Sequence, residues 1–467
     1  MALASCGRGP IPYGAVPTEQ QVEWQKMEMN MFCHFGPNTF TGLEWGRGSE
    51  PEDIFNPSAL DCGQWVSVAK AAGFKGVIVT AKHHDGFCLW PNPVTGHSVA
   101  ASAWRNGGGD VLRELSDACA AEGLKFGVYI SPWDRNDPRY GTDDYNEVFR
   151  QTLESALSGY GPVFEQWFDG ACGEGPGGKR QVYDWELFHS EVFKWQPSAV
   201  IFSDVGPGCR WVGNERGRAG ETSWSTFSPW LHGATAPGVT PGDYARYLGE
   251  GDADGGLWMP SETDVSIRPG WFWRESENSR VKSVDELLHI YYNSVGRNSL
   301  LLLNVPPDTR GLICAEDSLR LMEFRAALDS IFSYDCCAGA VASADSRYGW
   351  RYAAANVLDS SYDRYWAARR GASTATLTLE LDGEQCFNRV MLQEYIPLGQ
   401  RISSFEVDVL DSDGWKTVAD GTTVGYKRIL LIDPVRASAL RIRITGSLAE
   451  PTLTRIAAFQ DNISKSF

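Results

Sequence analysis

The stretch Phe164-Glu165-Gln166-Trp167-Phe168-Asp169-Gly170-Ala171 decides the fold of this chain. Its apolar character predicts a buried β-strand that delivers one carboxylate, Asp169, to the C-terminal end of the strand. Barrel enzymes keep their catalytic groups at that end. Gly170 lets the backbone turn after the acid, and Trp167 lies two residues earlier on the same strand face. A carboxylate beside an indole favours a sugar as the ligand.

The surrounding sequence alternates short β-rich runs with helical patterns from about Met27 to Asp308, which predicts a parallel sheet with crossover helices. Strands are expected at 30–35, 76–81, 125–131, 163–169, 199–204, 220–224, 257–262 and 299–304. Helices are expected at 62–72, 110–122, 145–159, 183–195, 284–295 and 316–331, the fifth beginning with a Ser283/Glu286 capping box. Eight strands close a (β/α)8 TIM-like barrel. The segment 205–260 predicts long loops over its mouth.

The pattern becomes purely β after about Asp335, which predicts an all-β sandwich. Its strands are expected at 375–381, 389–394, 404–410, 427–431 and 439–445. We therefore expect two domains, a catalytic barrel at 1–333 and a sandwich at 334–467.

Composition excludes some partners and suggests a location. The formal net charge of −17 argues against nucleic acid and anionic membranes. No apolar run reaches the ~20 residues of a membrane span, and no signal peptide is evident, which predicts a cytoplasmic protein. Leu3-Ala4-Ser5-Cys6 resembles a lipoprotein cleavage box, so secretion or lipid anchoring is the alternative if the N-terminus was trimmed. The eleven cysteines follow no regular spacing and predict reduced, mostly buried thiols. The number of subunits is not predicted.

A second acid is needed opposite Asp169, and the best candidate is Glu215 in the loop Gly213-Asn214-Glu215-Arg216-Gly217. Two carboxyl groups with different environments can divide the work of glycoside hydrolysis, one as ionised nucleophile and the other as proton donor. A retaining arrangement holds such groups about 5–5.5 Å apart. Glu165, Glu221 and Glu262 compete for the second role. Alternatively, Glu215 is a solvated loop acid and Asp169 a helix cap.

Three of the seven histidines, His34, His83 and His84, fall at expected strand ends. They can bind sugar hydroxyls, bind a metal or serve structure alone. Adjacent strand residues point apart and no HExxH spacing occurs, so we expect neither a metal nor another cofactor. Glu44-Trp45, Tyr129, Arg268 and Trp271 also lie at or beyond strand ends and offer acceptors, stacking faces and a cation.

These motifs together resemble the α-L-fucosidases of glycoside hydrolase family 29, from about Pro17 to Phe332. The blocks that carry the resemblance are His34-Phe35-Gly36-Pro37-Asn38-Thr39-Phe40, Lys82-His83-His84-Asp85-Gly86-Phe87-Cys88-Leu89-Trp90, Ser131-Pro132-Trp133-Asp134-Arg135, Trp167-Phe168-Asp169-Gly170-Ala171, Gly213-Asn214-Glu215 and Asp264-Val265-Ser266-Ile267-Arg268-Pro269-Gly270-Trp271. The resemblance implies a retaining mechanism in which Asp169 attacks the anomeric carbon of fucose. Glu215 would protonate the leaving oxygen and then activate water.

The resemblance also implies roles for the remaining pocket residues. His34, His83 and His84 would bind fucose hydroxyls, and the lining would comprise Glu44, Trp45, Tyr129, Trp167, Trp224, Arg268 and Trp271. The Ser-Pro-Trp-Asp-Arg and Gly-Asn-Glu forms are similar to the subgroup that prefers α-1,3- and α-1,4-linked fucose on Lewis-type branched glycans. Fucosylated oligosaccharides or glycoconjugates are then the expected partners.

The C-terminal segment resembles a discoidin-like (F5/8 type C) domain through Asn356-Val357-Leu358-Asp359 and Tyr365-Trp366-Ala367-Ala368. Such a sandwich either packs against the barrel or supplies a second glycan site. Asp359 and Asp363 are candidates for a calcium site there.

Three rival functions stay open. The barrel can be a fucosidase of broad specificity, an inert fucose-binding protein, or an exo-glycosidase for a related sugar such as L-galactose. An inert barrel is disfavoured because both acids are kept in matching contexts. L-Galactose would need a polar partner for its hydroxymethyl group.

Overall fold

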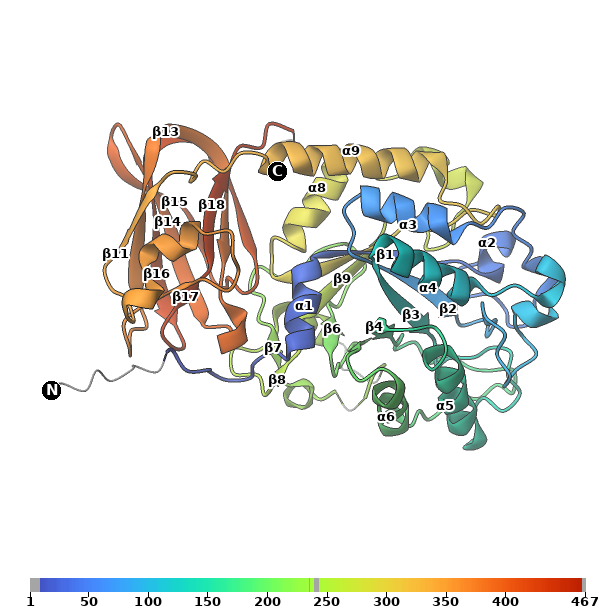
Figure 1. Ribbon diagram of the computed structural model, residues 1–467. Helices are drawn as coiled ribbons and strands as arrows, with labels where there is room; N and C mark the ends of the chain where they lie inside the picture. Colours follow the sequence, from blue (N-terminus) through green and yellow to red (C-terminus); the bar gives the residue numbers. More distant parts are fainter. Residues whose placement is uncertain (1–8, 235, 239–242, 464–467) are drawn as a thin grey trace.

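The computed structural model describes residues 9–234, 236–238 and 243–463. The Leu3–Cys6 motif lies outside these residues. Figure 1 shows a barrel beside a β-sandwich, with helix α9 running along one side of the barrel to the sandwich. No helix in the described part of the chain is both long enough and apolar enough to cross a membrane.

The barrel is a closed ring of eight parallel strands, which confirms the predicted fold class. The strands are β1 (Met29–Cys33), β2 (Gly76–Lys82), β3 (Lys125–Ile130), β4 (Val163–Trp167), β5 (Val200–Ser203), β6 (Cys209–Trp211), β9 (Ser261–Ser266) and β10 (Ser299–Asn304). The ring follows the chain order from β1 to β6, then continues through β9 and β10 back to β1. All eight strands therefore present their C-terminal ends on one face of the barrel.

The sixth and seventh strands lie elsewhere than expected. No strand forms over 220–224, and the sixth barrel strand is the three-residue β6. Its central residue, Arg210, is fully buried and donates to the carbonyls of Leu248 and Trp224 at 2.8 Å each. A short strand with a charged middle residue has no apolar signature. The seventh strand, expected at 257–262, is β9; the preceding β8 (Leu257–Trp258) pairs with β7 (Thr226–Phe227) outside the barrel.

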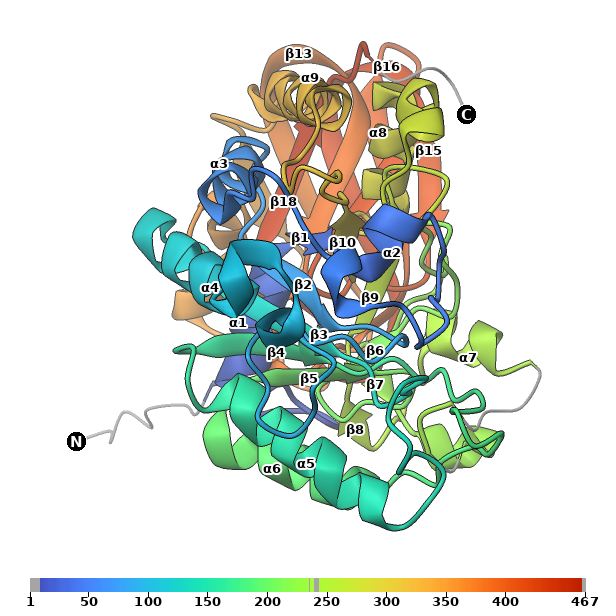
Figure 2. The same cartoon turned by 90° about the vertical axis from the view of Figure 1, so that its right-hand side faces the viewer.

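The helices largely follow their predicted positions, and helices α3 to α6 lie outside the strands in Figure 2. They are α1 (Glu19–Met27), α2 (Pro37–Thr41), α3 (Cys62–Ala71), α4 (Val111–Glu122), α5 (Asp144–Leu157), α6 (Trp185–Trp195), α7 (Tyr244–Glu250), α8 (Val284–Asn293) and α9 (Ala315–Phe332). The Ser283/Glu286 capping box at the start of α8 is confirmed. Helices α1, α2 and α7 were not predicted, although α1 begins with a second capping box, Thr18 with Gln21.

The barrel interior is a core of its own, separate from the one between strands and helices. It contains aromatic side chains together with two buried acids, Glu165 and Glu262. Trp24 of α1 donates its indole N–H to Glu165 at 2.8 Å, and Trp167 of β4 donates to Glu262 at the same distance. Burial raises the pKa of both carboxyls, which also hydrogen-bond each other. The two acids therefore hold a proton more strongly than exposed carboxyls do.

The C-terminal domain is an antiparallel sandwich, as predicted, with longer strands. They are β11 (Val341–Ala344), β12 (Trp366–Ala367), β13 (Ala375–Gln393), β14 (Ile402–Asp411), β15 (Gly414–Gly421), β16 (Arg428–Ser447), β17 (Thr452–Leu453) and β18 (Arg455–Phe459). The strands expected at 375–381 and 389–394 form one continuous strand, β13, and those expected at 427–431 and 439–445 form another, β16. Both continue through register shifts. Asp359 forms an ion pair with Arg364 at 2.6 Å.

Most of the described cysteines are buried, and all of them are free thiols, as the sequence predicts.

A buried ion pair joins helix α9 to the barrel. Arg268, just after β9, places its Nε 2.8 Å from Asp317 in the first turn of α9. Both side chains are fully buried. The other guanidinium nitrogens donate to Asn278 Oδ1 at 3.0 Å and to Cys314 Sγ at 2.8 Å. Every nitrogen of Arg268 is thus engaged within the protein.

We expect Asp317→Ala to lower the free energy of unfolding by about 3–5 kcal/mol, because it leaves a buried guanidinium without its counter-charge. The exposed pair Arg325–Asp329 on the same helix provides a matched control. There, Asp329→Ala should cost less than about 1 kcal/mol. Urea denaturation followed by tryptophan fluorescence measures both. Equal small losses would contradict a structural role for Arg268.

Candidate active site

A pocket opens at the C-terminal ends of the barrel strands, where the sequence places the chemistry. It is lined by Phe32, His34, Glu44, Trp45, His83, His84, Tyr129, Trp167, Asp169, Glu215, Asp264 and Trp271. These residues come from β1, β3, β4 and β9 and from the segments that follow β1, β2, β4, β6 and β9. Ten of the twelve predicted catalytic and substrate-binding residues thus meet in one cavity.

Asp169 lies two residues beyond β4 and is held by its surroundings. Its Oδ2 accepts a hydrogen bond from the Tyr129 hydroxyl at 2.9 Å and lies 3.5 Å from His84 Nε2. Its Oδ1 accepts from the backbone N–H of Ala171 at 2.8 Å. Tyr129 stacks on Trp167, with ring centroids 5.2 Å apart. The carboxylate is therefore oriented on both oxygens and remains partly open to the pocket.

The three histidines are buried and neutral. Burial lowers the pKa of His34 to about 3 and that of His84 to about 4, and it lowers the pKa of His83 well below its ordinary value. His34 Nδ1 lies 2.9 Å from Asn304 Oδ1, so that nitrogen carries the proton and Nε2 is left as an acceptor. His84 Nδ1 lies 2.8 Å from the Ser131 hydroxyl. Neutral imidazoles combine one donor with one acceptor, which suits sugar hydroxyls.

Glu215 stands across the pocket at its rim, in the loop after β6. The Trp271 indole hydrogen-bonds to its carboxylate. Desolvation raises the pKa of Glu215, and the charges of Asp169 and Glu44 raise it further. Glu44 is itself fixed, because it pairs with Arg274 and accepts the backbone N–H of Trp271 at 3.2 Å. Glu215 thus holds its proton to a higher pH than an ordinary glutamate does, and it shares the pocket with the oriented carboxylate of Asp169.

Two residues predicted to bind substrate do not line this pocket. Trp224 is buried in the long loop after β6, where its carbonyl accepts from Arg210. Arg268 is fully buried and paired with Asp317, so its guanidinium does not reach the pocket. A tryptophan or arginine in a variable loop looks the same in sequence whether it faces a cavity or fills a core.

The acids that competed with Glu215 have other positions. Glu165 and Glu262 form the hydrogen-bonded pair within the barrel. Glu221 lies at the domain interface, paired with Arg297 and with Arg428 of the sandwich. Asp134, in the quoted motif Ser131–Arg135, forms a buried ion pair with Lys82 at 3.1 Å.

Two pocket residues, Phe32 and Asp264, were not singled out from the sequence. Asp264 lies on β9 and accepts from the Trp211 indole at 2.7 Å. Burial and the charge of Glu215 raise the pKa of its carboxyl to about 8. Asp264 falls within a quoted family motif, whereas Phe32 precedes the first one, and correct placement of β9 would have turned Asp264 toward the barrel interior. Asp264 is protonated at neutral pH and joins Glu44, Asp169 and Glu215 as the fourth carboxyl of the pocket.

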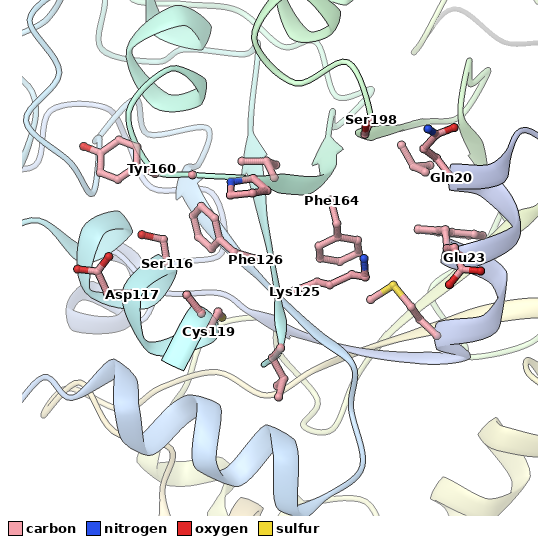
Figure 3. Close-up of a pocket in the computed structure, with 18 of the residues that line it drawn as sticks. Gln20, Glu23, Ser116, Asp117, Cys119, Lys125, Phe126, Tyr160, Phe164 and Ser198 are labelled. Carbon is pink, nitrogen blue, oxygen red and sulfur yellow. The ribbon is translucent and has the colours of Figure 1, made fainter. Parts of the chain in front are cut away.

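A larger hollow lies at the opposite end of the barrel, where β3, β4 and β5 begin (Figure 3). Helix α1 contributes Gln20 and Glu23 on one side, and α4 contributes Ser116 and Asp117 on the other. Phe126 and Phe164 lie between them. None of the predicted catalytic residues lines it. That end of a parallel barrel contributes to stability rather than catalysis.

The profile of a family described as alpha-L-fucosidase matches residues 13–329, and that of the F5/8 type C domain matches residues 339–458. The chain is 44% identical to "Alpha-L-fucosidase 1" of Arabidopsis thaliana over 464 residues, covering 98% of this chain and 90% of the relative. A solved structure of a Ruminococcus gnavus family 29 fucosidase in complex with fucose is 31% identical, with a TM-score of 0.89. That likeness covers 99% of each chain.

The raised pKa of Asp264 predicts a pH dependence of stability. Its folded-state pKa is about 8 and its ordinary value is 3.8. At pH values between these two pKa values, Asp264 is ionised in the unfolded chain but protonated in the folded chain. The stability that Asp264 contributes therefore falls as pH rises. Asp264→Asn abolishes the titration and retains an oxygen that can accept from Trp211.

We therefore expect the loss of melting temperature between about pH 5 and pH 8 to be smaller in Asp264→Asn than in the parent chain. Differential scanning calorimetry at the two pH values measures this loss. The exposed acid variant Asp329→Asn is the control and should leave the loss unchanged. An identical loss in Asp264→Asn and the parent would mean that Asp264 is already ionised at neutral pH.

Proposed function

The chain belongs to the α-L-fucosidase family of glycoside hydrolases, and we propose that it hydrolyses terminal fucose with retention of configuration, using Asp169 as nucleophile and Glu215 as acid/base. The observation that carries this proposal is the pairing of two unlike carboxyls across one pocket. Asp169 is oriented by Tyr129 and Ala171, whereas Glu215 has a raised pKa. One acid is thus prepared to attack and the other to donate a proton.

In the first step, an Asp169 oxygen forms a bond to the anomeric carbon as the bond from that carbon to the glycosidic oxygen breaks. Glu215 transfers its proton to the departing oxygen, so the aglycone leaves as a neutral alcohol. In the second step, the Glu215 carboxylate takes a proton from water while the water oxygen attacks the anomeric carbon and releases Asp169. Another sugar hydroxyl can replace water, which gives transfucosylation.

The pocket wall supports fucose as the sugar. Phe32, Trp167 and Trp271 present aromatic surface there, and Trp167 is sandwiched between Tyr129 and Phe202. Such a wall suits the 6-methyl group of fucose and offers no partner to the hydroxymethyl group of L-galactose. The neutral histidines face the remaining, hydroxylated side.

We further propose that the linkages cleaved are α-1,3 and α-1,4 in branched, Lewis-type glycans. The pocket rim supports this specificity. Trp45 is 59% exposed and meets Trp133 edge to face, with centroids 5.8 Å apart. The Arg135 guanidinium lies over the Trp133 ring at 5.5 Å. These aromatic and cationic groups can bind the sugars that are attached next to fucose in a branched glycan. A simple aryl fucoside lacks those sugars.

Substitution of the two acids tests the mechanism. Asp169→Ala should abolish turnover, and azide should restore it with formation of β-fucosyl azide, since a small anion can occupy the space of the lost carboxylate. Glu215→Ala should slow the trisaccharide by about 10²-fold or more and should affect activated aryl fucosides much less. Near-normal trisaccharide rates in both variants would overturn the assignment.

The linkage and the stereochemistry are tested by proton NMR of a Lewis a trisaccharide digest, with 2-chloro-4-nitrophenyl α-L-fucoside in parallel. We expect α-fucose to appear before mutarotation, with the aryl fucoside much slower. Equal rates on both substrates would indicate a fucosidase of broad specificity. Release of β-fucose would exclude retention, and absence of fucose from either substrate with folded protein would favour an inert fucose-binding barrel.

A further inference from the structure

We propose that the C-terminal sandwich positions the acid/base loop, and that Arg428 and Thr423 are positioning residues for Glu215. The inference rests on the proposed role of Glu215. It is carried by a set of contacts that reach from the sandwich to the segment directly after that loop. The domain then has a part in catalysis besides packing.

The loop that carries Glu215 has little regular structure to support it. It begins after the three-residue strand β6 and contains no helix or strand between Val212 and Ser225. Its near end is fixed by the Val212 N–H, which donates to the Glu262 carbonyl at 2.9 Å. Asn214 closes the loop on itself by donating to the Arg218 carbonyl at 2.9 Å. The position of Glu215 therefore depends on how the far end is held.

The far end is held by both domains. On the barrel side, the Asn293 carbonyl accepts the Ala219 N–H at 2.8 Å and Asn298 donates to the Ser223 carbonyl at 2.9 Å. The sandwich supplies further contacts. Arg428 donates to the carbonyl of Glu221 at 2.7 Å and to its carboxylate at 2.9 Å. The Thr423 hydroxyl accepts the N–H of Ser223 at 2.8 Å, and Thr222 meets Thr422 at 2.9 Å. Arg428 and Thr423 are both buried, and the bond between Thr423 and Ser223 is shielded from water.

Gln400, from the turn between β13 and β14, extends the same attachment. Its amide nitrogen donates to the Ser223 carbonyl at 3.0 Å, and its oxygen accepts the N–H of Ser225 at 2.7 Å. The barrel adds Arg297, which pairs with Glu221 and donates to the Ala219 carbonyl at 3.2 Å. Residues 221–225 thus lie along the surface of the sandwich and are hydrogen-bonded to it.

Such an attachment matters because proton transfer requires close placement. A displacement of about 1 Å at a catalytic group can cost ~10²-fold in rate. The cost is confined to substrates whose leaving group needs the proton. Loosening the loop should therefore slow the trisaccharide and spare a fucoside with a good leaving group. A contact that serves only to hold the two domains together would change the rates on the trisaccharide and on the activated fucoside by the same factor.

The neighbouring residue supplies a matched control. Lys427 also forms an ion pair across the domain interface, but its partner is Glu28 at the end of α1, away from the Glu215 loop. Backbone bonds from Asn298 N–H to the Lys427 carbonyl and from Ile429 N–H to the Gly296 carbonyl, each 2.9 Å, hold this part of the interface without either side chain. The variants Arg428→Met and Lys427→Met should therefore both keep the domains together.

The experiment compares kcat/KM for the Lewis a trisaccharide and for 2-chloro-4-nitrophenyl α-L-fucoside in Arg428→Met, Thr423→Val and Lys427→Met. We expect Arg428→Met to reduce the trisaccharide value by about tenfold or more and the aryl value by less than about threefold. Thr423→Val should show the same selective loss to a smaller extent, and Lys427→Met should show none. Arg428→Lys should recover part of the loss.

The pH profile gives a second readout. The pocket raises the pKa of Glu215 above its ordinary value. A loop that moves toward solvent would bring that pKa back down, so the alkaline limb of the trisaccharide profile should shift to lower pH in Arg428→Met and stay in place in Lys427→Met.

A uniform loss on both substrates, or unchanged kinetics in a folded Arg428→Met, would overturn the inference. If Arg428→Met fails to fold, Thr423→Val carries the test, because it removes one hydrogen bond without a change of shape. Glu215→Gln run alongside separates the two hypotheses. If that variant lacks the selective trisaccharide defect, the proposed role of Glu215 fails, whatever the interface variants do.

Discussion

The pocket depends on how two acids within the barrel are satisfied. Glu165 and Glu262 lie inside the barrel, hydrogen-bond each other and accept indole N–H bonds from Trp24 and Trp167. An unpaired charge at this depth would cost several kcal/mol, and burial accordingly raises the pKa of both carboxyls. Glu262 fixes Trp167 through the indole N–H. Tyr129 stacks on the Trp167 ring, and its hydroxyl in turn orients Asp169. The chemistry at the mouth thus rests on hydrogen bonds near the centre of the barrel.

The pocket also controls charge by excluding water. Its three histidines are neutral and Asp264 is protonated at neutral pH, while Asp169 and Glu215 differ in environment. Many titratable groups therefore meet in a small volume with little net charge. Glu44 is paired with Arg274, so Asp169 is left as the oriented carboxylate that can stabilise a developing oxocarbenium ion.

The sequence was most informative where a residue follows a long apolar strand. His34, His83, Tyr129 and Asp169 could be placed because β1 to β4 are apolar and the positions at their ends follow directly. The expected strand ranges put Glu215 before the sixth strand, whereas it follows that strand, because β6 has only three residues and a buried arginine and was not recognised. The family motif nevertheless identified it.

The remaining errors concern side-chain direction. Arg268 and Trp224 lie near the mouth in sequence, and their contacts with Asp317 and with the interior of the loop depend on tertiary packing. Asp264 was missed for the opposite reason, because an acid in the middle of a strand resembles a strand-breaking residue until the neighbouring Trp211 is seen to bond it. The direction in which such a side chain points follows from tertiary packing and cannot be predicted from the sequence pattern alone.

Helix α1 has a consequence for the order in which the chain can fold. It is the first described helix, yet its partners come much later: Trp24 bonds Glu165, Gln21 bonds the Trp258 carbonyl, and Glu28 pairs with Lys427 of the sandwich. During synthesis this helix therefore emerges long before the residues that bury it. The base of the barrel is completed by contacts of high sequence separation, which favours slow, late closure once nearly the whole polypeptide is available.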